Sequence, residues 1–239
     1  MIDILRDYGL ILLVGQYPQG PLGGLAMTLV LAVGARALSF PLAVAVGVAR
    51  TAQHRPVAWA AALYANSIRG LPLLLVVFWA YFAVPYLTGR AVSATLMMLV
   101  ALVVYESAYL GEIVRAGIVA LPGGQVQAAR ALGMRPGTIL RRIVLPQALY
   151  NMIPSMLNQF VVVVKNTSMA YVIGVDELTN AAYQINGQLL TRPFEVYALL
   201  AACYFVLCFL LGRAVAGVER RIGRRRGEGA GAAPQPVFE

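Results

Sequence analysis

Hydrophobic residues occur in long runs along most of this chain, and few charged positions interrupt them. The runs cover approximately residues 22–48, 57–87, 91–113, 148–173 and 194–218. The second run contains a break at Arg69-Gly70-Leu71-Pro72. Each is at least as long as the stretch of about 20 residues that an α-helix needs to cross a bilayer. The repeated apolar–polar alternation typical of membrane strands does not occur, so backbone groups in the hydrocarbon would be satisfied within helices. The pattern predicts an all-α integral membrane protein with about five transmembrane helices.

Composition supports a membrane protein. Charged residues make up 12% of the chain, against about 25% in ordinary soluble domains.

The 239 residues divide into one membrane domain, 22–221, an N-terminal segment, 1–21, and a basic tail, 222–239. The N-terminal segment has a short apolar core and no small-residue cleavage site, so it predicts an interfacial segment rather than a signal peptide. The Gly- and Ala-rich end of the tail predicts disorder.

Arginine placement predicts the orientation in the membrane. One side collects Arg50, Arg55, Arg115, Arg130, Arg135, Arg141, Arg142, Arg213, Arg220, Arg221, Arg224, Arg225 and Arg226. The other side has only Arg6, Arg90 and Arg192. Since arginines concentrate on the cytoplasmic side, we expect the N-terminus outside and the C-terminus in the cytoplasm. The net charge of +9 forms no basic stripe on a soluble face, so no nucleic-acid partner is expected.

One polar, arginine-bearing segment, 116–146, separates the third and fourth apolar runs. Pro122 and two glycines break the preceding helix, and a short helix is expected over Gln125–Leu132. Gly133 suits the left-handed position that ends such a helix. A second short helix is expected over Thr138–Val144, closed by Pro146. Two short helices held at a defined angle favour a docking surface for a partner over a solvated spacer.

This segment resembles the "EAA" loop of permease subunits of ABC importers. The resemblance is carried by Gln127-Ala128-Ala129, Gly133 and Leu145-Pro146 in this position between two spans. Further similarity lies in the stretches 67–74, 108–115 and 165–168. Together these stretches are similar to the polar amino-acid permeases, and residues 57–59 and 75–81 to their glutamate/aspartate members in particular.

The resemblance implies the type I ABC importer permease fold in a bacterial cytoplasmic (inner) membrane. It also implies four kinds of partner: a dimer of ABC ATPases, an extracytoplasmic amino-acid-binding protein, a second permease subunit and the lipid bilayer. ATP and Mg²⁺ would be bound by the ATPases, and no cofactor by this chain. The residues expected to couple to the ATPases are Gln127, Ala128, Ala129, Leu132, Gly133, Leu145 and Pro146. Gln127 stands where many members of the family have Glu, so no charge pair with the ATPase is expected there.

Polar residues inside the spans are candidates for the substrate pathway, because ionisable groups at membrane depth usually face a cavity or a partner. The candidates are Arg69, Glu106, Lys165, Asn166 and Thr167. Arg69 and Lys165 would compensate the carboxylates of an acidic amino acid. The alternatives are that Arg69 or Lys165 pairs with Glu106, or extends to the headgroups. Glu112 and Arg115 are expected to form a local ion pair, and Arg36 has no partner evident from the sequence.

This sequence lacks the residues that several other classes of function require. The only lysine, Lys165, follows a run of valines, so no phosphate-binding loop exists and the chain is not expected to hydrolyse ATP. His54 is expected in a solvated turn, and Cys203 and Cys208 form neither a disulfide nor a metal pair. An ion-coupled secondary transporter would need an internal repeat and several acidic ligands, but Glu106 is the only well-placed carboxylate. A neutral or basic amino acid remains the alternative substrate.

Overall fold

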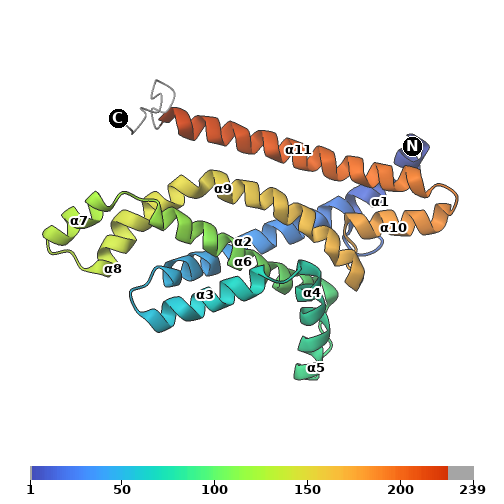
Figure 1. Cartoon of the computed structure of the whole chain (residues 1–239). Helices are drawn as coiled ribbons and strands as arrows, with labels where there is room; N and C mark the ends of the chain where they lie inside the picture. Colours follow the sequence, from blue (N-terminus) through green and yellow to red (C-terminus); the bar gives the residue numbers. More distant parts are fainter. Residues whose placement is uncertain (1, 226–239) are drawn as a thin grey trace, which may run out of the picture.

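The computed structural model describes residues 2–225, and all regular elements in that range are helices (Figure 1). They are α1 (Ile2–Val14), α2 (Gly24–Arg50), α3 (Arg55–Arg69), α4 (Leu73–Phe78), the π-helix η1 (Trp79–Ala83), α5 (Val84–Thr88), α6 (Ala94–Val119), α7 (Gly123–Ala131), α8 (Pro136–Ile139), the π-helix η2 (Leu140–Val144), α9 (Leu145–Asn166), the 3₁₀-helix η3 (Thr167–Ile173), α10 (Leu178–Leu189) and α11 (Pro193–Arg225). The all-α prediction is confirmed.

The predicted spans correspond to the longest helical segments. Helices α2, α6 and α11 are long and apolar enough to cross a membrane, and α3 with α4–α5 adds a fourth span if the bent pair counts as one. Helix α9 is not recognised as a membrane span from its composition, because its apolar residues are mixed with Gln159, Lys165 and other polar positions. It nevertheless packs along α6 and α11 as a full member of the bundle.

Helices α2 and α6 form the most extensive contact in the bundle. Two glycines permit their close approach. A Cβ atom added at Gly47 would lie 2.5 Å from Val114, and one at Gly111 would lie 2.8 Å from Val46. Small residues at such positions let membrane helices approach closely and pack by van der Waals contact. In lipid this packing drives helix association, because the hydrophobic effect does not act between helices there. The α2–α6 pair is therefore the frame against which α3 and α9 are placed.

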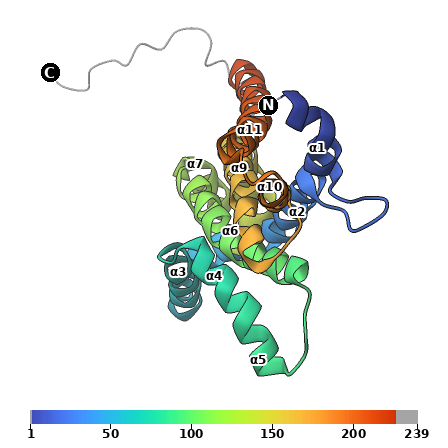
Figure 2. The ribbon, with the colours of Figure 1, turned by 90° about the vertical axis from the view of Figure 1, so that its right-hand side faces the viewer.

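The second span is broken where the sequence predicts it. Helix α3 ends at Arg69, and α4 begins after Pro72 at an angle of 104° between the two segments. Leu71 precedes a proline, which disfavours helical backbone at that residue, and Pro72 has no N–H to continue the helix. Figure 2 shows α4 and α5 extending away from the rest of the bundle. In this part of the chain, residues Trp79 and Tyr86 are 73% and 87% exposed.

The two ends of the bundle differ in structure (Figure 1). Helices α7 and α8 lie at one end with the end of α11, whereas α1, α10 and the start of α11 lie at the other. There Ile4 and Leu12 of α1 pack with Leu178 and Ile185 of α10 in one buried cluster. The predicted interfacial segment thus includes a helix docked on the protein. Helix α11 continues to Arg225, past the predicted end of its span, and the predicted disorder of the tail concerns residues outside those described.

The close α2–α6 contact generates a stability prediction. We expect Gly47→Ala to destabilise the protein by about 1–3 kcal/mol, because the added methyl group overpacks against Val114. Gly212→Ala is the matched control, since a Cβ there meets nothing within 4 Å. The measurement is the thermal midpoint of the purified protein in mild detergent. Equal midpoints for the two variants would show that the helices do not need a glycine at this crossing.

Candidate functional site

The segment between α6 and α9 forms two helical pieces, as predicted, with different bounds. The first helix is Gly123–Ala131 rather than Gln125–Leu132. The prediction that Pro146 closes the second helix is wrong, because α8 passes through η2 directly into α9 and Pro146 lies in the first turn of α9. At this point the N–H of Leu145 bonds to the carbonyl of Leu140, five residues back. This wider π turn accommodates a proline that has no N–H to donate.

Gly133 fixes the turn between α7 and α8. Its φ is +73°, in the left-handed region, as the sequence predicts. The N–H of Gly133 bonds to the carbonyl of Arg130 at 2.9 Å, and that of Met134 bonds to the carbonyl of Ala129 at 3.1 Å. These two bonds form a Schellman motif, which satisfies the last carbonyls of α7 and sets the exit angle of the chain.

The residues of the predicted coupling motif divide between an inner and an outer face. Ala129 is 3% exposed and packs with Ile139 and Val144, so it holds α7 against α8 and η2. Gln127, Ala128 and Pro146 are exposed, Leu132 is 82% exposed, and Leu145 is half-buried. The Nε2 of Gln147 donates to the Oε1 of Gln125 at 2.7 Å, which ties α9 to α7. The outer face of α7 is thus a small, rigidly mounted surface without charged residues at the motif positions.

A polar cluster lies deep in the bundle. Glu106 of α6 is fully buried and accepts from the Nε2 of Gln159 at 3.2 and 3.3 Å, and its second amide partner is Asn166. Arg36 of α2 faces the same carboxylate and donates from Nη2 to the carbonyl of Met156 at 2.8 Å. Within the part of the chain that the structure describes, Arg36 Nη1 has no hydrogen-bond partner. The cluster joins α2, α6 and α9 through groups that are costly to bury unless they bond to one another.

Arg36 is the member of this cluster to which sequence reasoning assigned no role. The signal for it was an arginine in the middle of an apolar run, which marks a buried polar contact without identifying the partner. Of the predicted pathway residues, Glu106 and Asn166 come together here. Thr167 is buried and donates to the carbonyl of Val164 at 2.7 Å. Lys165 is exposed, and within residues 2–225 no carboxylate lies in ion-pair distance of it.

The structure places Arg69 elsewhere, at a second charged cluster. Its Nη1 lies 3.3 Å from the Oε2 of Glu112, so the predicted alternative of a pair with Glu106 is wrong. The expected Glu112–Arg115 pair is confirmed, with Nε and Nη2 of Arg115 at 2.9 and 2.6 Å from Oε1. Arg50, the last residue of α2, also bonds to Oε2 of Glu112. One carboxylate therefore joins guanidinium groups from three helices, and Arg69 is held by this cluster rather than beside Lys165.

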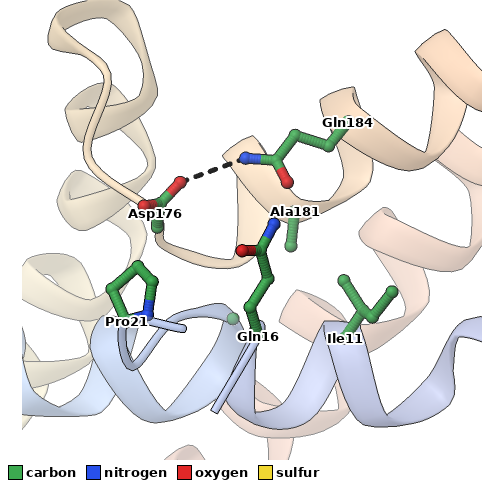
Figure 3. Close-up of a pocket in the computed structure, with 8 residues that line it drawn as sticks. Ile11, Gln16, Pro21, Asp176, Ala181 and Gln184 are labelled. Carbon is green, nitrogen blue, oxygen red and sulfur yellow. Dashed lines mark hydrogen bonds between the residues drawn. The ribbon is translucent and has the colours of Figure 1, made fainter. Parts of the chain in front are cut away.

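A third polar group precedes α10, between the spans. Glu177 is fully buried, accepts from the backbone N–H groups of Thr179 and Asn180 at 2.9 and 3.0 Å, and caps α10. The hydroxyl of Tyr204 donates to it at 3.0 Å. Burial raises the pKa of Glu177 to about 7. Figure 3 shows the neighbouring Asp176, which accepts from Gln184 at 3.1 Å beside a small pocket. These contacts fix α10 at the end of the bundle opposite α7.

Three comparisons with known proteins agree. Residues 39–224 match the family described as binding-protein-dependent transport system inner membrane component. The chain is 36% identical over 214 residues to the probable glutamine ABC transporter permease protein GlnP of Bacillus subtilis (strain 168), covering 87% of this chain and 98% of the relative. It is 32% identical over 207 residues to the glutamate/aspartate import permease protein GltK of Escherichia coli O157:H7, covering 84% and 92%.

Two solved structures have a similar fold. An amino acid ABC transporter solved with histidines has a TM-score of 0.76 and 34% identity, covering 83% of this chain and 92% of that one. The MetNI methionine ABC transporter in an inward-facing conformation has a TM-score of 0.67 and 22% identity, covering 82% and 91%. The latter similarity concerns the fold alone.

Proposed function

The chain belongs to the family of inner membrane components of binding-protein-dependent transport systems, and from this premise we propose that it forms one half of the membrane pathway of an ATP-driven importer of polar amino acids. It is a permease subunit of an amino-acid ABC importer, as its relatives and its structural neighbour are. In the proposed complex two ATPase subunits lie on the cytoplasmic side, a binding protein delivers the amino acid outside, and a second permease subunit completes the pathway. The N-terminus lies outside and the C-terminus in the cytoplasm.

The observation that carries the coupling role is the rigid mounting of α7. Its inner face is buried through Ala129, its end is fixed by the Schellman turn at Gly133, and its outer face presents Gln127, Ala128 and Leu132. A surface that transmits force must not deform when its partner moves. Here α7 is joined to α6 on one side and through α8 and η2 to α9 on the other, so a displacement of α7 displaces both spans.

The proposed mechanism is alternating access driven by ATP. When the two ATPases close on ATP, they draw the α7 helices of the two permease subunits together, and the attached spans swing to open the pathway toward the binding protein. Hydrolysis on the ATPases reverses the movement. The chain itself needs no cofactor for this cycle, because its contribution is a change in the population of two arrangements of its helices.

For the substrate we propose an acidic amino acid, glutamate or aspartate. The supporting observation is Lys165, an exposed ammonium group at the end of α9 with no carboxylate in ion-pair distance among the described residues. The adjacent, half-buried Asn166 supplies a further polar group. The second candidate is a neutral amide such as glutamine, which the similarity to GlnP favours. Other relatives carry the names of arginine and cystine systems, so similarity alone does not decide between substrates.

Gly133→Val tests the coupling role. Valine at φ +73° is strained by about 1–2 kcal/mol, so the turn after α7 should open and the exit angle should change. We expect the protein to insert and assemble, but the amino acid imported per ATP hydrolysed should fall. Gly137→Val is the matched control, because Gly137 has a negative φ and open space around it. Normal uptake by the Gly133 variant in reconstituted vesicles would remove the coupling assignment.

Lys165→Gln tests the substrate. If the ammonium group compensates an acidic side chain, its removal should reduce glutamate uptake by about tenfold and leave glutamine uptake within about twofold. The measurement is uptake of each labelled amino acid by vesicles containing the whole complex and the matching binding protein. Equal losses for both amino acids would assign the lysine to structure, and a preparation that transports only glutamine would establish the second candidate.

A further inference from the structure

Glu112 lies on the helix that enters the coupling segment. Helix α6 ends at Val119, and α7 begins at Gly123 after a short break. Glu112 is thus about two turns from the end of α6 that any movement of α7 reaches first. Because an α-helix is stiff over such a length, a displacement of α7 carries Glu112 with it.

The carboxylate of Glu112 divides its bonds between its own helix and two others. Arg115, on the same helix, makes both of its contacts to Oε1, at 2.9 and 2.6 Å. Oε2 is shared by Arg50, at the end of α2, and Arg69, at the end of α3, the latter at 3.3 Å. Of the bonds made by Glu112, only those of Oε2 join α6 to other spans. The three guanidinium groups repel one another, so the single carboxylate is what keeps them together.

Arg69 has two further contacts to α6. Its guanidinium group lies over the ring of Tyr109, 5.6 Å from the centroid, and its carbonyl accepts from the Tyr109 hydroxyl at 3.4 Å. Tyr109 is in turn held by Tyr105, whose ring centroid lies 4.8 Å away and whose hydroxyl donates to it at 3.1 Å. The last residue of α3 is therefore attached to α6 through its side chain and its backbone.

The contacts between Arg69 and α6 lie directly before the break in the second span. The N–H groups of Gly70 and Leu71 bond back into α3, to Asn66 and Ile68, whereas Pro72 has no N–H to bond back. Helices α4 and α5 leave this point at 104°. A change in the position of Arg69 therefore alters the direction of α4–α5 without the cost of breaking an intact helix.

We propose that Glu112 and Arg69 are positioning residues that pass the movement of the coupling segment from α6 to the bend of the second span. When α7 is displaced, α4 and α5 then change their angle to α3. The contacts of Arg69 with Glu112 and Tyr109 transmit this movement. This link rests on the proposed function, since it needs ATPases that move α7.

The test uses the whole complex, with its ATPases and binding protein, in lipid nanodiscs. Spin labels at Arg55→Cys and Thr88→Cys, one at each end of the bent span, report its angle, with Cys203 and Cys208 replaced by serine and one permease subunit labelled. We expect ATP to change the distance between the labels in the otherwise unchanged protein. The change should be lost in Arg69→Gln and Glu112→Gln, and uptake per ATP hydrolysed should fall by about tenfold in both.

Arg115→Gln is the matched control, because Arg115 binds the same carboxylate without joining two helices. We expect it to retain the distance change and uptake within about twofold. If Arg69→Gln does not fold, Tyr109→Leu removes the two other contacts of Arg69 while leaving Glu112 in place, and it should reduce the distance change.

Two outcomes would overturn the link. One is a normal distance change in Arg69→Gln or, where that variant does not fold, in Tyr109→Leu. The other is a loss in Arg115→Gln as large as in Arg69→Gln. A failure of the proposed function is recognised separately, because the unmutated complex would then show no ATP-dependent change and no ATP-driven uptake.

Discussion

Charged and polar side chains inside an apolar helical bundle must find partners within the protein, because hydrocarbon offers them none. This constraint organises the molecule at two depths. Glu106, with the amides of Gln159 and Asn166 and with Arg36 facing it, joins α2, α6 and α9 deep in the bundle. Glu112 joins α2, α3 and α6 closer to the coupling segment. The glycine contacts of α2 with α6 bring the helices close enough for both sets of bonds to form.

The parts of the structure that depend on local sequence were predictable. The apolar runs predicted the long helices, the stretch before Pro72 predicted the break in the second span, and Gly133 predicted a left-handed turn. The two short helical pieces within 116–146 were also predictable, because turn residues and short helices are encoded by neighbours in the chain. The resemblance to the family was recognised from such short stretches, and the family match extends over residues 39–224.

The parts that depend on tertiary contacts were not predictable. Pro146 indicates a helix end, but packing of the η2–α9 junction retains a continuous helix through a π turn. Arg69 and Arg36 were recognisable as charges within apolar runs, yet their partners are 40 or more positions away in sequence and on other helices. No rule of spacing links such residues, since only the packing of α3 and α9 against the α2–α6 pair brings them together.

Two polar clusters hold the helical bundle together, and we propose that the exposed helix α7 is the surface through which ATPases move it. The most direct test is site-specific photo-crosslinking from Leu132, which is 82% exposed on α7, in the native membrane. Buried Ala129, 3% exposed on the same helix, provides the control position. We expect Leu132 to be crosslinked to an ATPase with a phosphate-binding loop and Ala129 not to be. A protein that shows no such crosslink and transports amino acids alone in liposomes, driven by an ion gradient, would contradict it.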